Sequence, residues 1–422
     1  MTAISKNNKK IERDLCLSQR YKWTVSPLPV DILLGENNIL VSDIQTRIAH
    51  KKIFVKLLLI SFTSFIRLCY YYIRQFFITT SATAVNHLVI DTGRGYEFNK
   101  IENIFHINRN EIDFISAFNL QNYAKYQRIE FIPLVRALID SIDDYMVLFK
   151  IYNSERFLEC IFKHVGKNIA TYAYLRSFFL SLRDKNKNCI IYTSGAVLPA
   201  HAAISSGFKV INLYHGLMDK ISLHSFPEYH SIYIYSDYEK NYLYKLRVKS
   251  ELHIYPFLPV INKSNNIIVF MADHIKKIEF EVLFDMIKLF ESFKYKVYIK
   301  THPLNNASDL FMKDYNLKRY NPYDLFDVSK LHIIDNGLAA DLIKEVKPNF
   351  VVGWDSTSLC EALNMSIIPI NITNVDTNKN KLLEVYSHTK NALVWPADKG
   401  LILDFLAKKV SYKEMENFIR LK

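Results

Sequence analysis

From residue 86 onward, the sequence alternates short β-branched or aromatic runs with longer stretches of helical periodicity. This alternation constrains the fold most, because strands that alternate with helices form parallel sheets built from βαβ units. The expected fold class is therefore α/β. Ten runs are predicted to be strands, at residues 87–91, 103–108, 188–193, 209–213, 231–235, 267–271, 296–300, 331–334, 349–353 and 366–371. Helical patterns fill the gaps, and residues 111–184 are predicted to be mostly helical.

The ten runs form two groups of five, which predicts two α/β domains. Residues 255–266 separate the groups, and the two prolines followed by a polar run there are typical of a linker. We therefore predict one domain at 86–258 and a second at 264–400. Residues 1–85 form a basic amphipathic segment ahead of them, and 401–422 form a terminal helix. A chain of 422 residues is long enough for this organisation.

The positive charge of the chain is concentrated near its start. The net charge is +12, and the first 80 residues hold twelve lysines and arginines against five acidic residues, a net of +7. Residues 52–78 are the most hydrophobic stretch, but charges interrupt them too often for a span of ~20 apolar residues. On a helix, four side chains would share one narrow, mostly cationic stripe: Lys56, Thr63, Arg67 and Arg74.

Two interpretations of this helix stay open. It is either an amphipathic helix on an anionic inner-membrane surface or a core helix with a few solvated charges. No nucleic-acid recognition motif accompanies the charge, so nucleic acid is not an expected partner.

The cysteines indicate the cellular compartment. The five are odd in number and far apart, without metal-ligand spacing or a disulfide framework. The first fifty residues also lack the arrangement of a secretory signal. We expect a cytoplasmic protein, peripheral to the cytoplasmic face of the inner membrane if the amphipathic helix binds lipid.

Polar residues follow several predicted strands, and ligands of parallel sheets bind at the carboxyl ends of the strands. The strand at 296–300 ends in Lys300 and runs into Thr301, His302 and Pro303. A cation and an imidazole at a strand end suit a phosphate or a developing negative charge. A structural turn ended by the proline is the alternative.

The strand at 349–353 runs into Trp354 and Asp355, and then into the hydroxyl side chains of Ser356, Thr357 and Ser358. Such residues are good helix N-caps, and a helix start also presents free N–H groups to a phosphate. Glu361, in the second turn of that helix, is placed to bind a ribose diol.

In the first domain, the strand at 209–213 runs into His215 and Gly216. A loop histidine is a candidate general base, because its pKa lies near neutrality, and a structural histidine is the alternative. The loops after two other strands add four residues to the same rim: Gly93, Arg94, Ser194 and Gly195.

Only ten glycines are present, and we expect them where backbone geometry requires glycine. Five of the ten fall in these strand-end turns: Gly93, Gly95, Gly195, Gly216 and Gly353.

With these motifs, the chain resembles GT-B glycosyltransferases, in which two Rossmann-like domains face a cleft and the C-terminal one holds a nucleotide-sugar donor. The sequence KTHP, followed about fifty residues later by Ser356-Thr357, resembles bacterial sialyl-, polysialyl- and β-Kdo transferases, which use CMP-activated acidic sugars. That resemblance implies that His302, Ser356 and Thr357 contact the donor phosphate. Where those enzymes have an acidic-acidic-glycine base motif, this chain has Tyr214-His215-Gly216.

Other features widen the choice of activity. The His215-Gly216 loop, together with KTHP and DSTS, is similar to CDP-glycerol glycerophosphotransferases. The helix SLCEALN with Glu361 is similar to UDP-sugar GT-B enzymes and UDP-GlcNAc 2-epimerases. A non-catalytic scaffold of a polysaccharide assembly complex is a further alternative.

The resemblance implies a nucleotide-sugar donor and a lipid-linked or oligosaccharide acceptor as partners. The product would be a bacterial surface glycan: O-antigen, lipooligosaccharide or capsule. His215 and His302 are the expected catalytic residues. No metal or other cofactor is expected, so the helix start and cations would stabilise the leaving phosphate.

Overall fold

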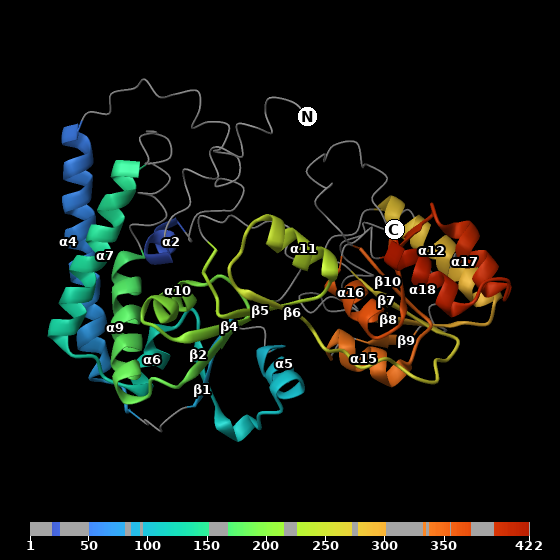
Figure 1. Cartoon of the computed structure of the whole chain (residues 1–422), viewed down its shortest axis with the longest axis horizontal. Helices are drawn as coiled ribbons and strands as arrows, with labels where there is room; N and C mark the ends of the chain where they lie inside the picture. The colour runs from blue at the N-terminus through green and yellow to red at the C-terminus, as the bar shows by residue number, and fades with distance from the viewer. Residues whose placement is uncertain are drawn as a thin grey trace, which may run out of the picture. The chain divides into compact units, whose positions relative to one another are not determined.

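The protein is described from a computed structural model, which covers residues 19–25, 50–80, 86–92, 96–151, 168–214, 226–271, 277–300, 332–334, 337–354, 356–372 and 392–421. Two compact units make up the chain. Unit 1 comprises Met1–Ile234 and Lys240–His253, and unit 2 comprises Tyr235–Glu239 and Ile254–Lys422. Each unit contains a six-stranded sheet (Figure 1).

The sheet of unit 1 has the strand order β2-β1-β3-β4-β5-β6. Its strands are β1 (His87–Asp91), β2 (Ile112–Ser116), β3 (Ile190–Thr193), β4 (Lys209–Leu213), β5 (Ser231–Ile234) and β6 (Glu251–Ile254). The first five strands pair in parallel. Strand β1 pairs with both β2 and β3, so the order of the sheet reverses beside it.

The sheet of unit 2 is parallel throughout, with the order β12-β11-β10-β7-β8-β9. Its strands are β7 (Asn266–Phe270), β8 (Lys296–Lys300), β9 (His332–Ile334), β10 (Phe350–Gly353), β11 (Ile368–Ile372) and β12 (Leu393–Trp395). Numbered from its own first strand, this is the order 3-2-1-4-5-6 of doubly wound dinucleotide-binding sheets.

Helices cover both faces of the second sheet. Its helices are α12 (Lys277–Ser292), α15 (Ala339–Val346), α16 (Thr357–Asn364), α17 (Lys399–Leu406) and α18 (Tyr412–Leu421). Ile267 and Val269 of β7 pack in one core cluster with α12, α17 and α18. The alternate residues Ile268 and Phe270 pack in a second cluster with α15 and α16. Because both faces are buried, these strands are nearly continuous apolar runs.

The helices of unit 1 build outward from its sheet. They are α2 (Gln19–Val25), α4 (His50–Gln75), α5 (Tyr96–Phe105), α6 (Leu120–Tyr126), α7 (Phe131–Ile151), α9 (Ile169–Lys185), α10 (Leu198–Ser205) and α11 (Asp237–Lys245), with α11 shared between the units. Helix α5 supplies Ile101 to a core cluster with Val89 of β1 and Leu213 of β4. Helix α10 packs against β4, α9 against α10, and both α7 and α4 against α9 (Figure 1).

The α/β fold with two parallel-sheet, Rossmann-like domains is confirmed, although some individual elements differ. The run at 103–108 is not a strand, because Ile101, Ile104 and Phe105 lie at helical spacing and continue α5 into the core. Strand β2, at the start of the stretch predicted to be helical, was not predicted, and neither were the short strands β6 and β12.

The long N-terminal helix is present as α4, with 26 residues. Among the described helices, none combines the length and apolar character that a bilayer-crossing segment needs. Thr63, Arg67 and Arg74 of the expected cationic stripe are exposed. The side chain of Lys56 lies outside the described residues.

Candidate functional site

The point where the strand order reverses in unit 2 lies between β7 and β10. Ligands of open parallel sheets bind beside such a point, at the carboxyl ends of the strands. Strand β10 ends there in Gly353, and α16 begins four residues later at Thr357. The candidate site is therefore built around the β10–α16 turn.

The turn is organised by Ser356, which is the N-cap of α16. The Ser356 hydroxyl accepts a hydrogen bond from the Ser358 backbone N–H at 3.3 Å, and the two hydroxyl oxygens lie 2.7 Å apart. The Ser358 side chain is buried. Ser356 thus has the capping role that its position predicts, while the start of the helix keeps its positive dipole end at the strand edge.

Thr357 and Glu361 lie one turn apart on the half-exposed side of α16. Glu361 lies near the buried hydroxyl of Tyr235, whose pKa is raised well above its usual value by burial and further by the Glu361 carboxylate. The Tyr235 carbonyl accepts a hydrogen bond from the Asn364 side chain at 2.6 Å. Glu361 therefore lies on the half-exposed side of the helix, close to the Tyr235 hydroxyl.

Lys300 is the last residue of β8 and is almost fully buried. Strand β7 lies between β8 and β10, so Lys300 is about two strand spacings, ~10 Å, from the β10–α16 turn. Its carbonyl accepts a hydrogen bond from the Met271 N–H at 2.9 Å, which ties the carboxyl ends of β7 and β8 together. The structure thus brings Lys300 and Ser356–Ser358 to the same edge.

Several predicted site residues lie outside the described part of the chain. In unit 2 these are His302, Pro303 and Asp355, and in unit 1 they are Gly93, Arg94, His215 and Gly216. Their roles stay predictions.

The corresponding edge in unit 1 is held by hydroxyl groups. The side chains of Thr92 and Ser194 lie 2.8 Å apart, which joins the turns after β1 and β3. The Gly195 carbonyl accepts hydrogen bonds from the buried Tyr229 hydroxyl at 3.1 Å and from Thr193 at 3.2 Å. Ser194 and Gly195 therefore lie at the strand edge where they were expected.

Two further residues at this edge were not predicted from the sequence. Lys100 of α5 donates a hydrogen bond from Nζ to the Tyr214 carbonyl at 3.0 Å, immediately before His215. Asn212 of β4 is fully buried, and its side-chain amide has no hydrogen-bond partner among the described residues. An asparagine inside an otherwise apolar strand run was the sequence signal that could have identified Asn212. The sequence around Lys100 carries no comparable signal.

The expectation about glycines is wrong at the two strand-end positions that the structure describes. Neither Gly195 nor Gly353 has a positive φ. A Cβ at Gly195 would meet nothing within 4 Å, and at Gly353 its nearest neighbour would be the Ser356 Cβ at 3.5 Å. Neither position therefore requires glycine on steric grounds.

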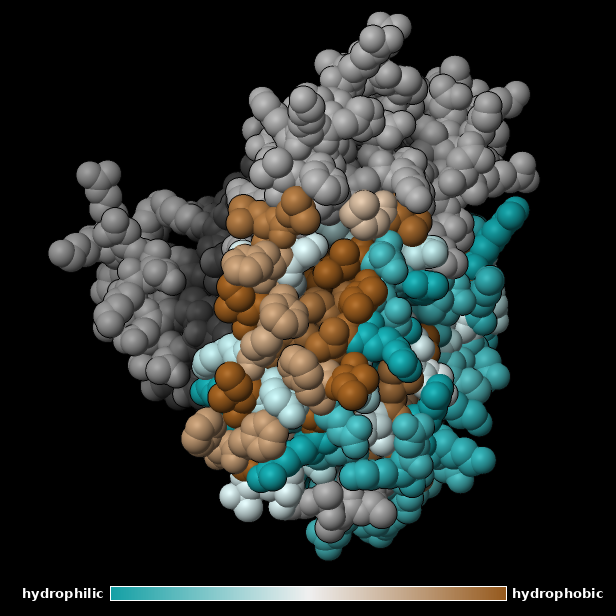
Figure 2. All heavy atoms as spheres, turned by 90° about the vertical axis from the view of Figure 1, so that its left-hand side faces the viewer, coloured by the Kyte–Doolittle hydropathy of each residue, from teal (hydrophilic) through white to brown (hydrophobic). Residues whose placement is uncertain are grey.

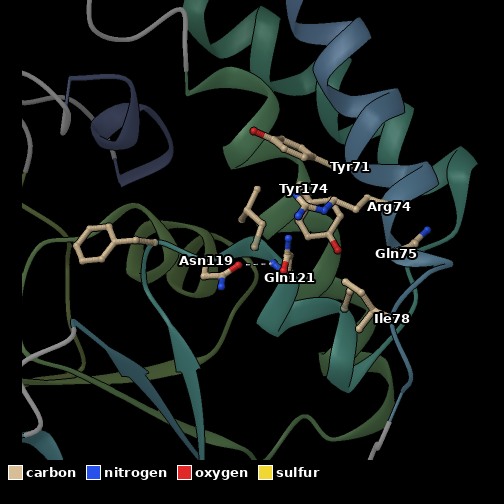
Figure 3. Close-up of a pocket in the computed structure, with 10 residues that line it drawn as sticks. Tyr71, Arg74, Gln75, Ile78, Asn119, Gln121 and Tyr174 are labelled. Carbon is tan, nitrogen blue, oxygen red and sulfur yellow. Dashed lines mark hydrogen bonds between the residues drawn. The ribbon is translucent and has the colours of Figure 1, made fainter.

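A pocket of about 210 Å³ lies in unit 1, where the end of α4 meets the start of α6 and the side of α9. Arg74 and Gln121 point into the same space beside Tyr174 (Figure 3). With its amide oxygen turned toward Arg74, Gln121 accepts a hydrogen bond from Nε at 2.9 Å. The rings of Tyr71 and Tyr174 meet edge to face 5.8 Å apart. The pocket thus combines one guanidinium group with aromatic walls.

Within the described ranges, no cluster of histidine, cysteine and acidic side chains is suited to hold a metal ion. Burial raises the pKa of the Cys189 thiol to about 12 and raises that of Cys360 as well. Both thiols therefore stay protonated near neutral pH and are poor nucleophiles.

No family model matches the chain, and no curated protein matches it either. Among solved structures, a glycosyltransferase from Rickettsia africae is 13% identical, with a TM-score of 0.42, over 80% of this chain and 92% of that one. S. aureus MnaA, solved with UDP, is 9% identical, with a TM-score of 0.42, over 80% and 91%. UDP-GlcNAc 2-epimerase from Methanocaldococcus jannaschii is 12% identical, with a TM-score of 0.38, over 60% and 81%. Likenesses this distant carry no argument about activity, and the sheet topology given above is the basis for the fold.

Proposed function

We propose that this protein is a GT-B glycosyltransferase whose unit 2 binds the nucleotide of an activated sugar. The observation that carries the proposal is the β10–α16 turn. It places the start of a helix and three hydroxyl residues where the strand order of a 3-2-1-4-5-6 sheet reverses. Phosphates bind at such helix starts because free N–H groups and the helix dipole both favour negative charge. Lys300 adds a cation at the same edge.

The donor in this proposal is a CMP-activated acidic sugar of the sialic acid or Kdo type. The KTHP and Ser356-Thr357 motifs support this choice. The acceptor is a bacterial surface glycan, in the form of O-antigen, lipooligosaccharide or capsule, carried on lipid at the cytoplasmic face of the inner membrane. The concentration of positive charge in the first 80 residues supports this location.

The proposed reaction is a direct displacement with inversion at the sugar. His215 takes the proton of the acceptor hydroxyl, and the oxygen attacks the anomeric carbon. The bond from that carbon to the phosphate oxygen breaks, and the electron pair leaves with the nucleotide. His302, Lys300 and the first N–H groups of α16 stabilise the negative charge on the leaving phosphate.

Nucleotide binding tests the proposal most directly. Thermal unfolding in the presence of CMP, CDP, UDP or GDP should show a selective rise of Tm with CMP, because a ligand that binds only the folded state stabilises it. A selective response to CDP would favour a CDP-glycerol-type transferase instead. A response to UDP would favour a UDP-sugar transferase or 2-epimerase, which Glu361 also supports. No response to any nucleotide would contradict the proposal and favour a scaffold.

The role of His302 has its own test. His302→Ala should lower kcat by roughly 10²–10³, the effect of removing one group that stabilises transition-state charge. His332→Ala is the matched control, because His332 lies on the neighbouring strand β9 with its ring stacked on Tyr298 at 4.9 Å. Near-normal turnover by His302→Ala would refute the assignment.

A further inference from the structure

Helix α4 exposes its apolar side and buries polar groups. Its fully buried side chains, in the part described, are Ser64, Leu68 and Gln75, two of which are polar. The opposite side carries large apolar side chains that are 41–63% exposed: Leu58, Leu59, Phe62, Phe65, Ile66, Tyr70 and Ile73. A helix that packs on a protein core and otherwise faces water has the reverse arrangement.

The exposed apolar side of α4 continues onto neighbouring segments. Phe76 and Phe77, just after α4, are 50% and 84% exposed, and on α7 Ile132 and Ile139 are 74% and 55% exposed. The Tyr72 ring packs 5.0 Å from Phe131 and joins the two helices. We call this combined surface of α4 and α7 the apolar face. It is visible as the brown and tan area of Figure 2. Monomeric proteins in water rarely expose apolar patches of such extent.

The charges around the apolar face are mainly positive. No acidic residue lies between Asp43 and Asp91 in the sequence, so α4 carries only basic charges. Arg67 and Arg74 are exposed on α4, and the Arg128 guanidinium lies 5.5 Å from the centre of the Phe76 ring. At α7, exposed Arg136 is offset by exposed Asp143 and by exposed Glu130, which directly precedes the helix. An apolar surface bordered by arginines is complementary to an anionic bilayer, because the arginines reach the headgroups while the apolar side chains enter the acyl boundary.

The pocket described above, which we call the Arg74 pocket, is lined by residues at the end of α4, the helix that carries most of the apolar face. Arg74 donates a hydrogen bond from Nη1 to the Tyr70 hydroxyl at 2.9 Å, so a residue of the face holds the cation of the pocket. Among the described residues, the partners of Arg74 are neutral groups, the Tyr70 hydroxyl and the Gln121 amide oxygen. No carboxylate is among these partners, and the paired N–H donors of the guanidinium group suit a phosphate that takes the place of the Gln121 amide oxygen.

We infer that the apolar face docks on an anionic phospholipid bilayer and that the Arg74 pocket takes the phosphate of one lipid headgroup. The inference deepens the proposed membrane location and rests on it. It adds α7 to the lipid-facing surface and assigns Arg74 a specific contact. Residues 59, 62, 66, 70, 73 and 77 recur at helical spacing on one line, so α4 lies flat along the surface rather than crossing it.

Vesicle flotation of the full chain tests the apolar face. The protein should float with vesicles of phosphatidylglycerol and phosphatidylethanolamine. The triple variant Leu59→Ser/Phe62→Ser/Ile66→Ser should lose binding by about 100-fold or more, because three inserted side chains are removed. Leu258→Ser/Ile261→Ser is the matched control, since these residues of unit 2 are 78% and 75% exposed and should leave flotation unchanged.

Two results would overturn the docking inference. One is flotation of the triple variant equal to that of the unmodified protein, with the Tm of both unchanged. The other is an unmodified protein that does not float but elutes as a dimer which the triple variant dissociates, because the face would then bind a second copy. The single variant Phe62→Ser, with a smaller expected loss, repeats the test if the triple variant fails to fold.

A separate test of the Arg74 pocket distinguishes the paired donors of the guanidinium group from its positive charge alone. Arg74→Lys should weaken binding to phosphatidylglycerol vesicles by about fivefold, because lysine keeps the charge but loses the paired donors. Arg247→Lys, at an exposed arginine outside α4 and α7, keeps its charge equally and should bind as the unmodified protein does. Equal binding by both variants would overturn the pocket assignment, since only net charge would then matter.

Nucleotide binding separates this inference from the proposed function. Flotation that depends on the apolar face, without any Tm response to nucleotides, would leave the docking surface supported and the glycosyltransferase proposal contradicted. A rise of Tm with CMP, together with a protein that does not float, would support the glycosyltransferase proposal and contradict the docking surface.

Discussion

Helices α4 and α9 of unit 1 pack against each other, yet α9 is mostly buried and α4 is mostly exposed to solvent. Ten of the seventeen side chains of α9 are buried, among them Phe178 and Phe179 with no exposed surface. Helix α4 buries Ser64 and Gln75 and exposes phenylalanines and isoleucines. The comparison shows that apolar composition does not tell which helix lies in the core. In α4, a few fixed contacts determine which side of the helix faces the protein, such as the pair of hydrogen bonds between the Gln75 side chain and the Ile129 backbone.

The largest change in the free energy of unfolding is expected from a substitution at the buried side of α9. Phe178→Ala should lower the free energy of unfolding by about 3–5 kcal/mol, because it leaves a cavity beside Tyr123 and Phe179, whose rings lie 5.1 and 5.2 Å away. Urea unfolding monitored by circular dichroism measures the change. A loss below ~1 kcal/mol would contradict the burial of Phe178 in the core of unit 1.

A smaller loss is expected where α4 is anchored. Gln75→Ala removes two hydrogen bonds of 2.8 Å, one to the Ile129 N–H and one to its carbonyl, and leaves both groups buried. The expected loss in unfolding free energy is about 1–3 kcal/mol. Thr63→Ala on the exposed side serves as the control and should change little. Equal effects of the two variants would contradict the assignment of the buried side.

A substitution of Ser64 should raise the free energy of unfolding instead of lowering it. Its buried hydroxyl has no hydrogen-bond partner among the residues that the structure describes. Ser64→Ala removes an unsatisfied polar group and introduces a better helix former, so the unfolding free energy should rise by about 0.5–1 kcal/mol. A clear drop in Tm would show that the hydroxyl has a partner.

The smallest effect is expected on the apolar face. Phe62→Ser should change the unfolding free energy by no more than about 0.5 kcal/mol in the absence of lipid, because its side chain is 63% exposed. The same substitution should weaken vesicle binding. A large loss of stability without lipid would indicate that another part of the chain covers Phe62.

Much of the sheet structure could be predicted from local pattern. Strands β1, β4 and β8 begin and end where the apolar runs predict, and each begins at a histidine or a lysine that precedes the apolar residues. The strand prediction at 103–108 was wrong because Ile104 and Phe105 fit a strand and a helix equally well over so short a run. Strands β6 and β12 have four and three residues, too few to show a period.

The candidate site could be predicted only where its contacts join residues that are close together in the sequence. The N-cap role of Ser356 follows from its position before an apolar helix, and the structure has the same contact. The hydrogen bond from Lys100 to the Tyr214 carbonyl joins residues 114 positions apart, and nothing in either local sequence indicates it. Burial of Asn212 likewise depends on the packing of the whole unit.

The short segment Tyr235–Glu239 belongs to unit 2, although the strand before it and the residues after it belong to unit 1. Within unit 2, its Tyr235 carbonyl binds Asn364, and its ring packs 4.8 Å from Tyr255. The chain therefore passes between the units three times, after residues 234, 239 and 253. No single cut in the polypeptide divides them. A fragment that begins at residue 254 would lack five residues of its own unit, so unit 2 should fold fully only when those residues are supplied.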